Sequence, residues 1–151
     1  MTSINLLNLA KIGQLDPVPL SVDLVKRMLL SAKQRLRDAE FTQNSPETRF
    51  DCAYTAIRVV ADIGLHLNGF RTSTSKPGHH QTAVQCLSHT LGVDAATVRI
   101  LDGLRKQRNL SDCDGEMVTD AALQECLRQA QAIVTRVDSV LKEHPAFGIG
   151  G

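Results

Sequence analysis

The 151-residue chain is poor in aromatic residues, because it has no Trp, Tyr54 is its single Tyr, and Phe, Tyr and Trp together make up 3%. Nucleic-acid-binding sheets such as the RRM and the OB-fold stack bases on several aromatic rings, so this composition argues against both. The chain also lacks a large net charge, since Lys plus Arg is 17 and Asp plus Glu is 16. A polybasic protein that coats nucleic acid is therefore excluded, and contact with nucleic acid requires a local patch.

Long apolar runs are absent as well, since no stretch approaches the roughly 20 residues that span a bilayer. The first residues lack the basic start and continuous apolar core of a signal peptide, so we expect a cytoplasmic protein with no membrane partner. The four cysteines include no CxxC pair, which argues against structural zinc and favours buried or free thiols. GxSxG, ExxH and phosphate-loop motifs are missing too, and the sequence predicts no metal and no cofactor.

Apolar residues recur every three or four positions from about residue 21 to 143, which predicts amphipathic helices and no sheet. Pro46 suits the first position of one helix, and a shorter helix is expected over residues 79–92. The other helix starts are marked by residues that commonly act as N-caps: Ser21, Ser45, Asp94 and Thr119. About five helices joined by short links predict an all-α fold, an antiparallel up-and-down bundle.

The length corresponds to one domain, which the sequence divides into three parts. Residues 1–20 hold a short apolar segment that we expect to pack on the bundle or on a partner. Residues 21–143 form the bundle, and within it the polar connection 71–78 is expected to be mobile. Residues 144–151 are expected to be a flexible tail.

The segment from 101 to 115, LDGLRKQRNLSDCDG, combines several cations with directional polar groups. Arg108 lies four residues before Asp112, a spacing at which helical side chains form ion pairs. One interpretation is a solvated helix end. The other is a phosphate site, because planar guanidinium groups bind phosphate bidentately. Four polar side chains share one face of the expected helix: Asp102, Arg105, Asn109 and Asp112.

Two adjacent histidines, His79 and His80, stand at the start of the short helix expected over residues 79–92. Neighbouring side chains on a helix point about 100° apart, so the two rings are poorly placed to hold one metal ion together. One interpretation is that they begin the helix with one ring solvated and the other half-buried. The alternative is that they line a pocket.

Three stretches of the chain together resemble a bacterial branch of the HEPN superfamily over about residues 20 to 143. They are FDCAYTAIR at 50–58, GHHQTAV at 78–84, and LDGLRKQRN at 101–109 followed by DCDG. The resemblance implies an up-and-down helical bundle that dimerises and brings two arginine motifs together in a cleft. It also implies a ribonuclease, or a partner of a nucleotidyltransferase in toxin–antitoxin and defence systems.

The family motif consists of an arginine, a polar residue and a histidine four to six residues after the polar residue. By this resemblance Arg108 is the motif arginine and Asn109 the polar residue. The histidine is expected at 113 to 115, where this chain has Cys113, Asp114 and Gly115. The group that would assist RNA cleavage as acid or base is therefore missing.

Three hypotheses follow for the function. The first is a non-catalytic homodimer that binds a nucleotide, RNA or a protein partner such as a nucleotidyltransferase. The second is a metal-independent ribonuclease in which Arg108 stabilises the pentavalent phosphate. The third is a purely structural or interaction bundle. The candidate site residues of the first hypothesis are Arg105, Arg108, Asn109, Asp112, His79 and His80.

Overall fold

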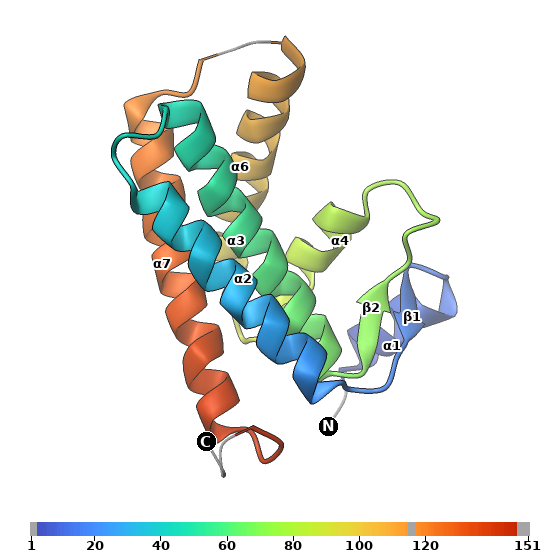
Figure 1. Ribbon diagram of the computed structural model, residues 1–151. Helices are drawn as coiled ribbons and strands as arrows, with labels where there is room; N and C mark the ends of the chain where they lie inside the picture. The colour runs from blue at the N-terminus through green and yellow to red at the C-terminus, as the bar shows by residue number, and fades with distance from the viewer. Residues whose placement is uncertain (1–2, 115–116, 148–151) are drawn as a thin grey trace.

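The computed structural model describes residues 3–114 and 117–147, with the side chains of 111–114 outside the described part. The expected helical fold class is confirmed, since most of the described residues lie in helices. Seven helices and two short strands occur in the described residues (Figure 1): α1 Ile4–Lys11, β1 Leu15–Pro17, α2 Val22–Glu40, α3 Pro46–Leu67, β2 Phe70–Thr72, α4 His79–Gln85, α5 Leu87–Thr90, α6 Ala95–Asp114 and α7 Asp120–Glu143.

The predicted helix starts are confirmed at all four capping residues. Ser21, Ser45 and Thr119 are the N-caps of α2, α3 and α7, and each hydroxyl accepts a hydrogen bond from a backbone N–H in the first turn. Asp94 precedes α6, and its carboxylate accepts from the N–H of Thr97 at 3.2 Å. These side chains satisfy donors that the first helical turn leaves without an intrahelical partner.

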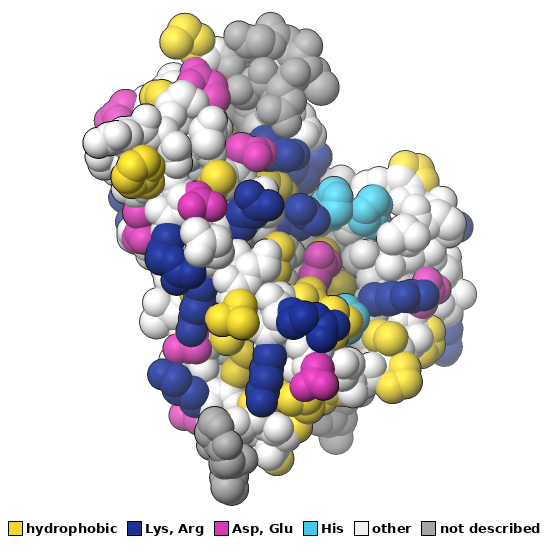
Figure 2. All heavy atoms as spheres, in the orientation of Figure 1, with side chains coloured by type: hydrophobic (Ala, Val, Ile, Leu, Met, Phe, Trp, Pro, Cys, Tyr) yellow, Lys and Arg dark blue, Asp and Glu magenta, His cyan; other side chains and the backbone are white. Residues whose placement is uncertain are grey.

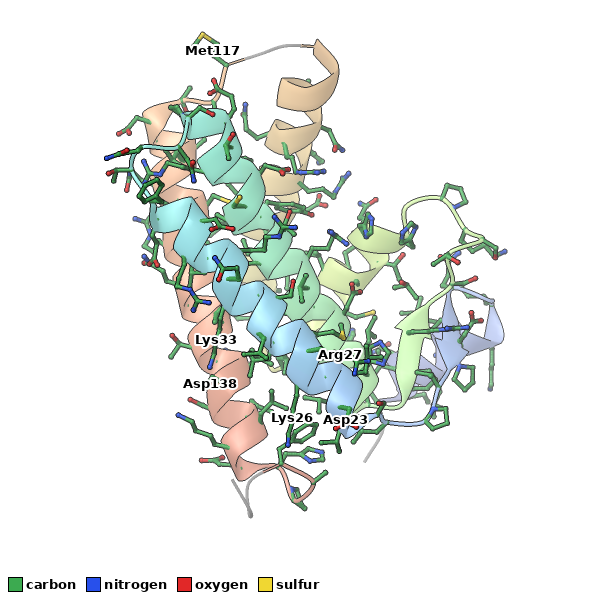
Figure 3. The ribbon with its side chains drawn as sticks, in the orientation of Figure 1. Asp23, Lys26, Arg27, Lys33, Met117 and Asp138 are labelled. Atoms are coloured by element: carbon green, nitrogen blue, oxygen red, sulfur yellow. The ribbon has the colours of Figure 1, made fainter. Side chains whose placement is uncertain are left out.

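Helices α2, α3 and α7 lie side by side, and α2 runs in the opposite direction to the other two (Figure 1). The predicted apolar stripe of α2 faces them, with Val25, Ala32 and Ala39 fully buried at intervals of seven residues. Helix α3 is buried along most of its length because α2, α7, α4, α5, α6 and β2 all contact it. Lys33 on α2 and Asp138 on α7 point toward each other and form an ion pair at 3.0 Å (Figure 3).

The expectation that the chain has no sheet is wrong, because β1 and β2 form a two-stranded antiparallel sheet. Its register pairs Leu15 with Thr72 and Pro17 with Phe70. Each strand has only three residues, too few for an alternating pattern to be recognised. Leu15 and Phe70 are buried and hold the pair against the core, so part of the polar connection 71–78 is a strand rather than a loop.

The expected number of about five helices is too low for two reasons. Residues 4–11 form a helix, with Leu6 fully buried, although so short a segment is marginal when isolated. The helix expected over 79–92 is divided at Cys86, whose N–H is shared between the carbonyls of Thr82 and Ala83. Shared bonds of this kind tighten a helix end.

The buried thiols agree with the sequence, since Cys52, Cys86 and Cys126 are buried and form no disulfide. Cys113 lies outside the residues whose side chains are described. Residues 144–147 form a turn in which Phe147 packs against the core. In the part of the chain that the structure describes, no helix combines the length and the apolar character needed to cross a membrane.

Candidate functional site

Helices α3, α4 and α6 meet around a pocket of about 190 Å³, which we call the arginine pocket. Five of the six candidate residues from the sequence line it, and the side chain of the sixth, Asp112, lies outside the described part. Figure 2 shows histidine side chains in cyan beside basic side chains in dark blue on this face. The pocket is lined by Tyr54, Arg58, Gly78, His79, His80, Gln81, Arg105, Arg108 and Asn109.

Helical spacing explains how separate stretches of sequence reach one pocket. Tyr54 and Arg58 are four residues apart on α3, and Arg105 and Arg108 are three apart on α6, so each pair shares a face. Packing of α3 against both α4 and α6 then brings these faces together with the first turn of α4.

Two of the three arginines are held by carboxylates. Arg108 Nε lies 2.6 Å from Asp51 Oδ1 on α3, so this ion pair links α6 to α3. Arg105 Nε lies 3.0 Å from Asp102 Oδ1 within α6, and Lys106 shares the same carboxylate at 3.5 Å. The Arg108 guanidinium also lies 5.8 Å from the centre of the Tyr54 ring, within range of a cation–π contact.

The third arginine, Arg58, contacts a histidine instead. Its Nη1 lies 3.5 Å from Nδ1 of His80, and because a guanidinium only donates, Nδ1 is the acceptor and the ring proton is on Nε2. Although much of the His80 side chain is exposed, partial burial and then the charge of Arg58 lower its pKa to about 4. His80 is therefore neutral at pH 7. The His79 ring is half-buried, and its centre lies 4.0 Å from that of His80.

Tyr54 lines the pocket and carries a hydroxyl that no described residue satisfies with a hydrogen bond. The side chain is 1% exposed, and its Oη has no partner in the described part of the chain. Burial raises the pKa of Tyr54 to about 12, so the hydroxyl is a neutral donor at physiological pH. A buried unpaired hydroxyl costs about 1–3 kcal/mol, which a ligand with an acceptor oxygen would recover.

A second pocket, of about 230 Å³, adjoins the first and shares His79 and His80 with it. We call it the Asp62 pocket. Burial raises the pKa of Asp62 to about 6, with Arg58 and His79 opposing the shift. Nδ1 of His66 is buried there without a partner among the described residues, and burial lowers the pKa of this histidine. The pocket is lined by Met28, Asp62, His66, Arg71, Thr72, Thr74, His79 and His80.

Sequence reasoning did not place Asp51, Tyr54, Arg58 or Asp62 in a site. Tyr54 is buried, as an aromatic residue on an apolar helix commonly is. The sequence does contain one signal for these residues, because polar residues recur at 51, 58 and 62 on a largely apolar helix. That recurrence marks one polar stripe, but not which other helix faces it.

A larger pocket of about 580 Å³ lies between α1 and the α4–α5 region. Its lining contains amides, apolar side chains and His89, but no Arg, Lys, Asp or Glu. The arginine pocket gathers far more groups that can bind or react, so it is the better candidate site. Within the described residues, no three His, Cys, Asp or Glu side chains are arranged to hold a metal ion.

Comparison of the chain with family models, with curated proteins and with solved structures found no match.

The raised pKa of Asp62 predicts how stability depends on pH. The folded state binds this proton more tightly than the unfolded state, whose carboxyl has its ordinary pKa of 3.8. The free energy of unfolding therefore falls as pH rises from about 4 to about 6, and the cost is fully present at pH 7.5. We expect Asp62→Asn to raise this free energy by roughly 2 kcal/mol more at pH 7.5 than at pH 4.5.

Urea unfolding followed by far-UV circular dichroism at the two pH values measures this difference. Asp23→Asn is the control, because Asp23 is exposed in the first turn of α2 and removal of its charge there should lower stability (Figure 3). An equal effect of Asp62→Asn at both pH values would contradict the prediction.

Proposed function

We propose that the protein is a non-catalytic, HEPN-like helical bundle that binds the phosphate of a nucleotide or of RNA in the arginine pocket. The observation that carries the proposal is the convergence of Arg58, Arg105 and Arg108, from two helices, on one pocket. Among the lining residues that the structure describes, none is a carboxylate. The resemblance of the motifs around Arg108 and Asn109 supports the same conclusion.

The arrangement of donors suits a phosphate group. Arg105 uses Nε for its ion pair, which leaves its two terminal nitrogens as donors. Arg58 forms no ion pair within 4 Å of a carboxylate in the described residues, and its interaction with the Asp62 carboxyl is through space. Together with the Tyr54 hydroxyl, these groups offer several charge-assisted hydrogen bonds to one anion.

Binding without cleavage is proposed because the acid–base groups are unsuitable. Cys113 stands in the region of the family's histidine, and an ordinary thiol with a pKa near 8.5 is mostly protonated at pH 7. His80 cannot take a proton at Nδ1 without losing the hydrogen bond from Arg58. Holding substrate and transition state equally well does not accelerate a reaction.

One observation favours the second candidate function, a metal-independent ribonuclease. His79 and His80 line the same pocket as Arg108, so imidazoles from α4 lie at the pocket of the motif arginine. In that mechanism Arg108 would stabilise the pentavalent phosphate and His79 would exchange protons with the substrate.

We also propose that the protein is a homodimer that associates through its N-terminal segment. Ile4, Leu7 and Ile12 of the N-terminal segment are 70%, 46% and 65% exposed, although Leu6 beside them is buried. Exposed apolar side chains clustered on one short segment favour association. We expect sedimentation at micromolar concentration to give a dimer, and a species of 16.5 kDa alone would refute the dimer.

Arg58→Gln tests the phosphate site without leaving a carboxylate unpaired. We expect it to weaken binding of a short single-stranded RNA about tenfold and to reduce the slope of log K against log salt by about 0.7. Fluorescence anisotropy at several salt concentrations measures both quantities. Arg37→Gln, which removes an exposed charge bonded only to Gln34, is the matched control and should change neither. RNA binding that is absent, or equal in both variants, would favour the purely structural hypothesis.

The wild-type protein is expected not to cleave RNA in EDTA, because general acid–base assistance, worth about 10²–10⁴-fold, is missing. The measurement compares wild type and Cys113→His on labelled single-stranded RNA by gel electrophoresis. Cleavage by wild type that Arg108→Ala and His79→Ala each abolish would establish the ribonuclease instead.

A further inference from the structure

We propose that the Asp62 pocket receives the guanine base of the nucleotide unit whose 5′-phosphate lies in the arginine pocket. This inference rests on the proposed function and extends it, because it assigns a ligand class to a second, adjoining pocket. Neither the family motif nor the arginines specify a base.

The two pockets are placed to hold two parts of one ligand. They share His79 and His80, so a molecule in one is in contact with the wall of the other. Arg58 and Asp62 are four residues apart on α3, which is about 6 Å along the helix axis. The two residues therefore lie close enough on one helix for a single nucleotide, extended from its phosphate to the far edge of its base, to contact both side chains.

The Asp62 carboxylate has the acceptor chemistry that guanine requires. It forms no hydrogen bond and no ion pair with other described residues, although it is largely removed from water. An ionised carboxylate accepts hydrogen bonds at both oxygens. Guanine presents two adjacent donors, N1–H and the 2-amino group, which match those oxygens. Adenine and cytosine each pair one donor with one acceptor, and uracil sets its single N–H between two carbonyls, so each would leave a carboxylate oxygen opposite an acceptor.

The rest of the pocket also suits a planar base. Its volume of about 230 Å³ compares with about 30 Å³ for one water molecule, which gives room for a bicyclic ring. Met28 and the rings of His79 and His80 supply surfaces for its faces. The buried Nδ1 of His66, which has no partner among the described residues, offers one further polar contact at the edge of the base.

Isothermal titration at pH 7.5 tests the inference with three probes: guanosine 5′-monophosphate, adenosine 5′-monophosphate and inorganic phosphate. We expect wild type to bind the guanine nucleotide at least about tenfold more tightly than the adenine nucleotide, the scale of one bidentate contact to a base. Asp62→Asn should bring that ratio down to about one or below, because an amide loses one of the two acceptors for guanine and can donate to the acceptor of adenine that the carboxylate repels. Asp23→Asn, the same change of charge in the first turn of α2, should keep the ratio of wild type. The same preference is expected between short RNAs that begin with a 5′-phosphorylated G or A.

A gain of binding provides a readout that a merely structural role would not produce. Xanthosine 5′-monophosphate has a carbonyl in place of the 2-amino group, so it repels a carboxylate but accepts from an amide. We expect wild type to prefer the guanine nucleotide to the xanthine nucleotide, and Asp62→Asn to reverse this order. Far-UV circular dichroism confirms that the variant is folded.

The outcomes separate the two proposals. Equal affinity of wild type for the guanine and adenine nucleotides, with phosphate bound and dependent on Arg58, would overturn the base pocket and leave the phosphate site standing. A preference for guanine that Asp62→Asn does not change would also overturn it. Failure of all three probes to bind would overturn the phosphate site and the base pocket together.

Discussion

The polar stripe along α3 is the constraint on which the rest of the site depends. This helix contacts α2, α7, α4, α5, α6 and β2, and half of its 22 residues are buried. Close approach is needed in places, since a Cβ at Gly64 would lie 2.6 Å from Oγ1 of Thr90. Asp51, Arg58 and Asp62 lie on the half-buried face that remains. Arg58 lines the arginine pocket, Asp62 lines the Asp62 pocket, and Asp51 binds Arg108 of α6.

The three arginines of the pocket differ in whether a carboxylate holds them. Arg108 is fixed by Asp51 across the α3–α6 contact, and Arg105 is fixed by Asp102 on its own helix. Such pairs position guanidinium groups but add little net stability when partly exposed, because solvent screens them. Arg58 is paired with the neutral ring of His80 instead. The arginine without an ion pair among the described residues therefore lies on the helix that lines both pockets, where its charge can attract an anion and also favours ionisation of Asp62.

Local features of the fold could be predicted from the sequence, and features that depend on distant partners could not. Ser21, Ser45 and Thr119 mark helix starts because a capping hydroxyl acts within three residues. The strand pair β1–β2 joins segments more than 50 residues apart and has too few residues for a pattern. The same limit applies to the site. The sequence predicts His79, His80 and Arg108 as candidate residues, but Asp51, which forms an ion pair with Arg108, lies 57 residues away along the chain.

Several polar groups without a hydrogen-bond partner among the described residues lie together on α3. Tyr54, Asp62 and His66 lie on α3 at spacings of eight and four residues, and each presents a buried or desolvated polar group without a partner in the described structure. Thr90 Oγ1 is similarly unpaired, but it lines neither pocket. Stability alone would favour apolar side chains at such positions, since an unpaired buried polar group costs free energy. Tyr54, Asp62 and His66 thus each lower the stability of the fold, and they lie on the same helix as the positive charge of Arg58. This arrangement supports a role in binding a polar ligand rather than in packing.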